Sequence, residues 1–211
     1  MSEPLLKVCG LTRADDVAAA VRLGATAVGF VFWPGSPRHL TAADAAALVA
    51  AVPDDVLPVG VFVDASVETI RQVVRESGIR GVQLHGDEPS SYADALGRPL
   101  WRAADLATVA AVERAWPPDV QLLLDAGDPV RRGGTGRVID WAGAAAVAAR
   151  RPVVLAGGLG PDNVAEAIRT VRPVGVDVSS GVERTPGTKD HDRLARFLMA
   201  ARRAFEEQER P

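Results

Sequence analysis

The sequence predicts an α/β fold, a single (β/α)8 TIM barrel that spans residues 1–211. Eight apolar, β-rich runs occur along the chain, and each is followed by a segment with helical periodicity. The runs begin near residues 5, 26, 58, 80, 99, 120, 152 and 174, so the spacing of about 21, 32 and 22 residues occurs twice. No proline-rich linker divides the chain. A doubly wound open sheet is the alternative, but the dinucleotide fingerprint is absent after the first run.

The first two units have clear boundaries. Leu5–Gly10 is an apolar run that ends at the only cysteine and a glycine, and Arg13–Leu23 follows with a helical pattern. Thr26–Phe32 is rich in β-branched and aromatic residues, which is typical of a buried strand. Trp33–Leu40 holds two prolines and a glycine and is therefore expected to be a loop.

Capping residues mark several of the remaining helices. Thr41 with Asp44, and Ser66, are predicted N-caps, and Asp190 is predicted to cap the final helix. Pro161 is expected in the first turn of the seventh helix. The other expected elements are strands at 58–63, 81–85, 100–104, 120–125, 152–156 and 174–178, and helices at 88–96, within 106–116 and at 141–150.

Composition limits the class of protein. The formal net charge is −3, with 24 basic and 27 acidic residues, so no nucleic-acid-binding or anionic-membrane surface is expected. A single cysteine cannot form an internal disulfide. Charges interrupt every long apolar stretch, and the amino terminus lacks the pattern of a signal peptide. These features predict a cytoplasmic protein without a membrane partner. A monomer or homodimer is expected, but no feature of the sequence decides between them.

The carboxyl ends of the strands are where a barrel of this kind places its site. Side chains alternate along a strand, so Lys7 and Cys9 share one face. If that face lines the barrel, the polar residues that end other strands converge at the same mouth: Asp64, His85, Asp125, Gly157 and Asp177. Asp64 can equally be a turn residue, Asp177 a loop brace and His85 a hydrogen-bonded loop residue.

The role of Cys9 has two possible interpretations. A neighbouring lysine stabilises a thiolate, so Lys7 would favour a reactive cysteine. A lone cysteine is otherwise a small buried hydrophobe.

Two loops of small residues follow the seventh and eighth strands. They contain Gly157 and Gly158, and Ser179, Ser180 and Gly181. Glycines allow backbone N–H groups to approach an anion, and this pair of loops is the usual phosphate site of the fold. The sequence therefore predicts a phosphorylated small-molecule ligand.

Two further loops are candidates for ligand contacts. Arg38 could pair with a substrate carboxylate through its guanidinium fork, although a solvated arginine is the simpler alternative. Ala126–Ile139 is long for a connection in so small a barrel, and Gly133–Gly136 predicts a lid.

Taken together, these residues resemble one family, phosphoribosylanthranilate isomerase of tryptophan biosynthesis. The resemblance extends from the first strand to the final helix. It is carried by Lys7–Gly10, Ser36–Arg38, Gln83–Gly86, Leu124–Asp125, Gly133–Gly136, Ala156–Leu159, Asp177–Glu183, Pro186–Gly187 and Lys189–Asp190.

The resemblance implies an Amadori rearrangement that needs no metal and no cofactor. It implies that Cys9 is the general base and Asp125 the general acid. From their places at the mouth of the barrel, the predicted substrate-binding residues are Lys7, Arg38, His85 and Asp177. An aldose isomerase of histidine biosynthesis is an alternative, but that family carries aspartate at the position of Cys9. A non-catalytic sensor of a phosphorylated ligand is the other alternative.

Overall fold

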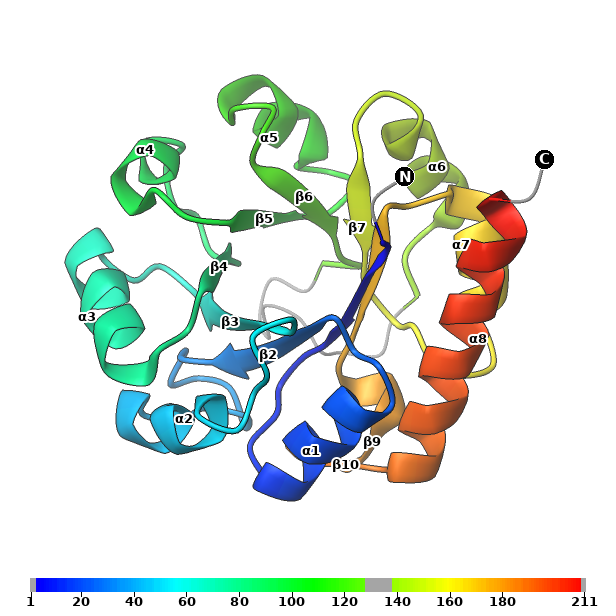
Figure 1. The fold of residues 1–211 in the computed structure, drawn as a ribbon. Helices are drawn as coiled ribbons and strands as arrows, with labels where there is room; N and C mark the ends of the chain where they lie inside the picture. The colour runs from blue at the N-terminus through cyan, green and yellow to red at the C-terminus, as the bar shows by residue number, and fades with distance from the viewer. Residues whose placement is uncertain (1–2, 128–137, 210–211) are drawn as a thin grey trace.

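Strands and helices alternate along the whole described chain, which comprises residues 3–127 and 138–209 of a computed structural model (Figure 1). The strands of the main sheet are β1 (Leu5–Val8), β2 (Ala27–Val31), β3 (Leu57–Phe62), β4 (Gly81–Leu84), β5 (Leu100–Ala104), β6 (Gln121–Leu124), β7 (Val153–Leu155) and β8 (Gly175–Val178). The helices are α1 (Ala14–Arg22), α2 (Ala42–Val49), α3 (Val67–Ser77), α4 (Tyr92–Leu96), α5 (Val109–Ala115), α6 (Trp141–Ala148), α7 (Val164–Val171) and α8 (His191–Glu209).

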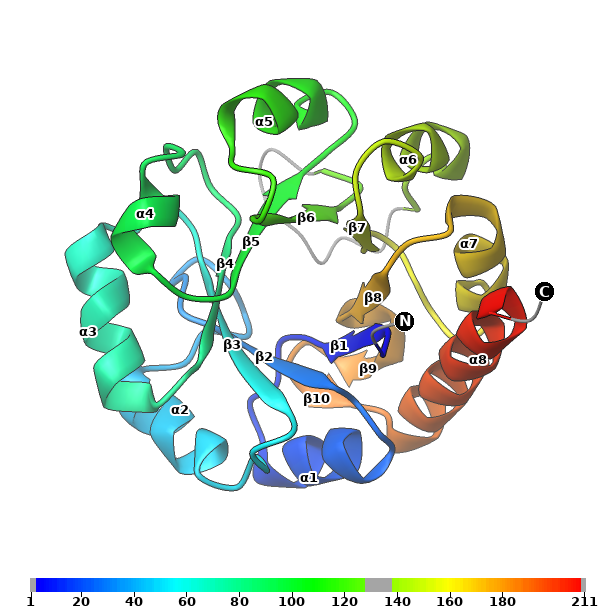
Figure 2. The same ribbon diagram turned by 45° about the horizontal axis from the view of Figure 1, so that its top comes forward.

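The main sheet closes on itself. Each strand pairs in parallel with the next, and β8 pairs back with β1 in a register that runs from Leu5 opposite Gly175 to Val8 opposite Val178. Figure 2 shows the strands around a central axis with the helices outside them. The predicted (β/α)8 barrel is therefore confirmed, and the open sheet is excluded.

Alternation along the strands separates two apolar layers. Inward-facing side chains such as Val59, Trp101 and Leu123 fill the barrel, because residues two apart share a face. Outward-facing side chains pack under the helices, and they include the four residues for which the sequence predicted this orientation: Leu122, Leu124, Val176 and Val178. Lys7 and Cys9 accordingly lie on the inner face.

Three predicted helix caps are confirmed. The Thr41 hydroxyl accepts a hydrogen bond from Asp44 N, and the Ser66 hydroxyl accepts one from Thr69 N. Asp190 Oδ1 accepts hydrogen bonds from the first backbone N–H groups of α8. These contacts satisfy donors that a helix start leaves unpaired.

Two helix starts differ from the prediction. The fourth helix begins at Tyr92 rather than Glu88, because the buried Glu88 carboxylate accepts hydrogen bonds from Asp64 N (2.8 Å) and Gly86 N (2.9 Å). The expected helical turn at Pro161 is a separate turn, and α7 begins at Val164.

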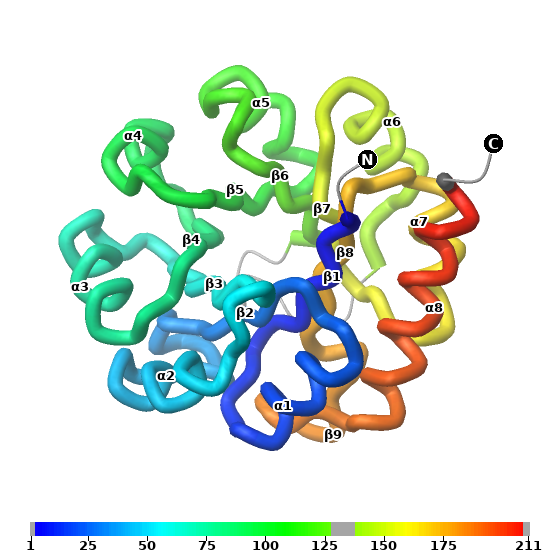
Figure 3. The backbone as a smooth tube through the Cα atoms, in the orientation of Figure 1, coloured from blue at the N-terminus to red at the C-terminus, as the bar shows by residue number. Residues whose placement is uncertain are grey.

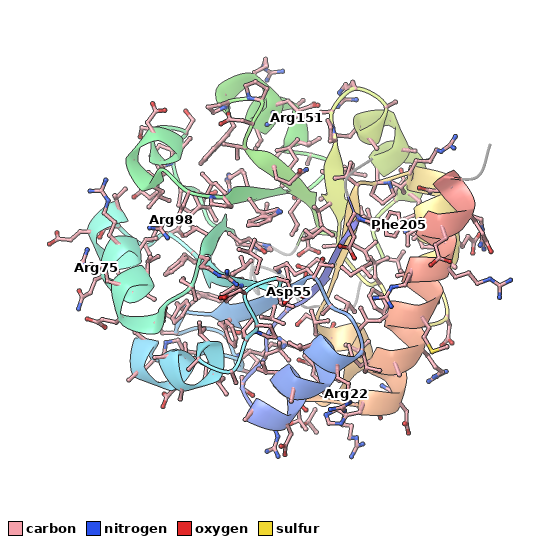
Figure 4. The ribbon with its side chains drawn as sticks, in the orientation of Figure 1. Arg22, Asp55, Arg75, Arg98, Arg151 and Phe205 are labelled. Carbon is pink, nitrogen blue, oxygen red and sulfur yellow. The ribbon has the colours of Figure 1, made fainter. Side chains whose placement is uncertain are left out.

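A small addition follows β8. A 3-10 helix, η1 (Ser180–Val182), leads into a two-stranded antiparallel hairpin of β9 (Glu183–Thr185) and β10 (Thr188–Lys189). The chain then enters α8, which returns between α7 and α1 (Figure 3). Phe205 lies on the barrel side of α8, whereas Arg75 on α3 points outward (Figure 4).

None of the helices within residues 3–127 and 138–209 has the length and apolar character to span a membrane.

Candidate active site

A pocket of about 460 Å³ opens at the carboxyl ends of the strands. Its wall includes most of the residues that the sequence selected: Cys9, Arg38, His85, Asp125, Gly157, Gly158, Asp177, Ser179, Ser180 and Gly181. Lys7 does not line the pocket. Its side chain is fully buried one level below, so any contact of Lys7 with a ligand must pass through its neighbours.

Cys9 and Asp177 line the bottom of the pocket, and the buried Lys7 side chain lies beneath both of them. Lys7 Nζ lies 2.9 Å from Asp177 Oδ2, and its charge also interacts with the neighbouring Cys9 side chain. Burial by itself would lower the pKa of Lys7, but Asp177 and Cys9 together raise it above its ordinary value. The lysine is therefore a permanent cation beneath the thiol. Asp177 Oδ1 is buried without a partner in the described part of the chain, which leaves an acceptor for a ligand hydroxyl.

The Cys9 thiol is less acidic than the nearby Lys7 led us to expect from the sequence. Burial raises the pKa of Cys9 and outweighs the opposing effect of Lys7, while Asp177 raises the pKa further. Lys7 does favour the thiolate, as the sequence predicted, but desolvation of the anion outweighs the effect of Lys7 and Lys189, so the pKa of Cys9 is raised on balance.

Gly29 makes room for the Cys9 and Lys7 side chains. A Cβ atom built on Gly29 would lie 2.8 Å from Cys9 Sγ and 3.2 Å from Lys7 Nζ. Both distances are shorter than ordinary van der Waals contact. Glycine at this point of β2 therefore lets the thiol and the ammonium lie side by side.

Asp125 stands at the end of β6, in contact with His85 from the end of β4. Asp125 Oδ1 accepts a hydrogen bond from Ala126 N at 2.7 Å, and Oδ2 lies 3.5 Å from His85 Nε2. Gln83 Nε2 lies 3.1 Å from His85 Nδ1 and orients the ring from the same face of β4. Burial raises the pKa of the Asp125 carboxyl despite the bond from Ala126 N. The carboxyl can therefore hold a proton at higher pH than a free aspartate.

Asp64 is a turn residue, as its simpler reading predicted. It adopts a left-handed backbone conformation with φ of 53° and accepts a hydrogen bond from Asp87 N at 2.6 Å. It braces the loops after β3 and β4.

The two small-residue loops form one wall of the pocket. Gly157 and Gly158 have φ of 77° and 68°, a conformation that favours glycine. Gly181 is the middle residue of η1 and lies against the Leu159 carbonyl, so a side chain at this position would collide with backbone. The loops after β7 and β8 thus interlock and face the pocket as the phosphate prediction requires.

Arg38 also faces the pocket, but its fork is already paired with a protein carboxylate. Its Nε and Nη2 atoms donate to Glu183 Oε1 (2.8 Å) and Oε2 (2.6 Å). The sequence prediction of a bidentate substrate contact missed this partner, which is 145 residues away in the chain. This pair uses two of the five N–H donors of the guanidinium, so the remaining three are what Arg38 can offer a ligand.

Sequence reasoning also assigned no role to Lys189. Lys189 Nζ donates to the carbonyl oxygens of Cys9 (2.6 Å) and Ser179 (3.1 Å) and to Glu183 Oε1 (2.9 Å). Glu183 and Lys189 both belong to motifs that carry the family resemblance, and only that resemblance could have indicated a role for them from the sequence.

The predicted lid at Gly133–Gly136 lies outside the described residues.

Comparison with known proteins agrees with this geometry. The family model described as "PRAI: N-(5'phosphoribosyl)anthranilate (PRA) isomerase" matches residues 6–200. The chain belongs to the N-(5'-phosphoribosyl)anthranilate isomerase family.

Its relatives in this family cover nearly the whole chain. The isomerase of Roseiflexus castenholzii is 46% identical over an alignment of 211 positions that covers 95% of this chain and 99% of the relative. The isomerase of Hahella chejuensis is 40% identical, over 95% of each chain.

Solved isomerase structures have the same fold. The Thermotoga maritima enzyme superposes with a TM-score of 0.85 at 37% identity, over 95% of this chain and 98% of that one. A phosphoribosyl anthranilate isomerase in complex with reduced 1-(o-carboxyphenylamino)-1-deoxyribulose 5-phosphate superposes with a TM-score of 0.82 at 36% identity, again over 95% and 98% of the two chains.

Proposed function

We propose that this protein isomerises N-(5'-phosphoribosyl)anthranilate to 1-(2-carboxyphenylamino)-1-deoxyribulose 5-phosphate in tryptophan biosynthesis. Family membership over residues 6–200 supports the reaction. The observation that carries the mechanism is that Cys9 and Asp125 line one pocket whose wall also holds the two small-residue loops.

Asp125 is the proposed general acid. The aldose must first open, and protonation of the furanose ring oxygen allows the anilino nitrogen to form an iminium ion. An acid for this step must be protonated near neutral pH. Burial, which raises the pKa of Asp125, supports that role. His85 is positioned to stabilise the carboxylate that remains after the proton has left.

Cys9 is the proposed general base. It removes the C2' proton of the iminium ion and gives an enolamine, which becomes the ketone. The positive iminium raises the acidity of the C2' proton and also favours the thiolate. In the ligand-free site the thiol keeps its proton because of burial, so we infer that the cationic intermediate and Lys7 together produce the active base.

The anionic ends of the substrate fit opposite parts of the wall. The phosphate is proposed to bind the backbone of Gly157, Gly158 and Ser179–Gly181, where glycine conformation exposes N–H groups. The anthranilate carboxylate is proposed to bind Arg38, and a ribose hydroxyl the free oxygen of Asp177. We further propose a single-domain cytoplasmic enzyme that acts as a monomer or homodimer on a small phosphorylated molecule.

Turnover by purified protein tests this proposal. The protein is expressed in a host that lacks its own isomerase, and loss of substrate fluorescence is followed in the presence of a metal chelator. We expect saturable conversion to the ketose. A folded protein that binds the substrate without converting it would instead be a sensor of a phosphorylated ligand.

A further inference from the structure

A buried charge cluster lies behind the phosphate wall, and the proposed acid–base chemistry does not use it. It consists of Glu183 and Lys189 on the β9–β10 hairpin, together with Arg38 from the loop after β2. The Lys189 side chain has no exposed surface, and that of Glu183 is 4% exposed. Such burial of three charges is costly unless each makes several hydrogen bonds.

Lys189 connects the ends of two neighbouring strands. Its Nζ donates to the carbonyls of Cys9 and Ser179 at 2.6 and 3.1 Å. These carbonyls lie just beyond the last paired residues of β1 and β8, where Cys9 N still donates to Val178 O at 2.8 Å. The ammonium group thus bridges β1 and β8 through hydrogen bonds beyond the last backbone pair of the two strands. One carbonyl belongs to the proposed base and the other to the proposed phosphate loop.

Glu183 does not require Lys189 as a partner. Arg38 already gives Glu183 a bidentate pair, and Gly187 N adds a further hydrogen bond at 3.2 Å. The Arg38–Glu183 pair is neutral by itself, so Lys189 adds one net positive charge in a place where burial lowers its pKa. A second buried cation that merely completed this pair would cost more than it contributes. The bonds to the two strand-end carbonyls account for its presence.

The backbone of Lys189 is fixed as well. Lys189 N donates to Asp16 Oδ2 at 2.9 Å, and Asp16 Oδ1 lies 2.8 Å from His191 Nε2. Asp16 belongs to α1 and is 2% exposed. Hydrogen bonds therefore fix Lys189 both at its backbone and at its ammonium group.

We propose that Lys189 is a positioning residue that holds the backbone of Cys9 and the phosphate loop at Ser179 in one fixed relation. The inference rests on the proposed function, since the distance between base and phosphate site matters only if both bind one substrate. A misplacement of about 1 Å between such parts can lower the rate about 100-fold.

The test is a double-mutant cycle in which total charge is controlled. Lys189→Met removes the cation, Glu183→Gln removes the anion, and the double variant has the same net charge as the parent protein. Arg150→Met, which breaks an exposed pair with Glu113 outside the barrel, is the surface control. The readouts are kcat, KM, thermal midpoint and the affinity for inorganic phosphate measured by titration calorimetry.

We expect Lys189→Met to lower kcat by about 10- to 100-fold and to weaken phosphate binding, while Arg150→Met changes neither. The double variant should remain impaired in both respects although its net charge is restored. Recovery of kcat and phosphate affinity in the double variant would overturn the proposal, because Lys189 would then only balance Glu183. Parent-like kcat in folded Lys189→Met would do the same.

If Lys189→Met alone does not fold, the double variant remains available for the test, because it keeps the net charge of the parent cluster. Phosphate affinity is measured without turnover. A parent protein that binds phosphate but converts no substrate would contradict the proposed function, and a loss of phosphate affinity in the double variant would still support Lys189 as the residue that positions the loop.

Discussion

The Gly29→Ala substitution tests whether the position of the Cys9 thiol controls the rate. The added Cβ would lie 2.8 Å from Cys9 Sγ, and normal contact needs about 3.5–4.0 Å, so the sulfur must retreat by roughly 0.7–1.2 Å. A displacement of that size should lower kcat by about 10- to 100-fold, or about 1.4–2.7 kcal/mol in the barrier. Overpacking should also cost about 1–3 kcal/mol in the free energy of unfolding.

Gly81→Ala is the matched control. Gly81 begins β4 at the other end of the barrel, and its added Cβ would lie 2.8 Å from Trp101 Cζ3. The same overpacking should therefore lower stability while kcat stays near the parent value. Both variants are compared by steady-state kinetics, thermal unfolding and the rate of Cys9 alkylation. If Gly29→Ala keeps parent-like kcat and alkylation, the thiol position is not what limits the reaction.

Four other outcomes are expected. Cys9→Ala and Asp125→Ala should each lower kcat by about 10²- to 10⁴-fold with small changes in Tm, and a parent-like kcat for folded Cys9→Ala would show that the thiol only packs. Burial raises the pKa of Asp125, so its contribution to stability falls as pH rises from its unfolded pKa to its folded pKa. Asp125→Asn should therefore raise Tm more at about pH 7 than at about pH 4, and an equal shift at both would contradict that sign. Gly158→Asp should raise KM strongly through charge repulsion with phosphate; an unchanged KM would remove the loop from the phosphate site. Arg38→Met should impair the normal substrate more than a decarboxylated analogue, and equal impairment would argue against the carboxylate contact.

The sequence predicted what depends on short-range pattern. Alternation along single strands was enough to place Lys7, Cys9 and Asp125 on the inner face, because side-chain direction repeats every two residues. Caps such as Thr41 and Ser66 were predictable for the same reason, since each contact spans three residues.

The features that were missed depend on distant contacts. Arg38 pairs with a carboxylate 145 residues away, and Lys189 reaches a carbonyl 180 residues away, so no local pattern could indicate either bond. Glu88 resembled the start of a helix, but its carboxylate accepts from Asp64 N instead. The pKa of Cys9 depends on burial, which is set by the whole barrel rather than by Lys7 alone.

The seam between β1 and β8 has a consequence for synthesis of the protein. Lys7 is synthesised 170 residues before its partner Asp177, and Cys9 is synthesised 180 residues before Lys189. The nascent chain therefore carries an incomplete site while the intervening residues are added. Barrel closure also completes the surroundings of Cys9, so we expect activity to begin only when the last strand and the hairpin after it have docked.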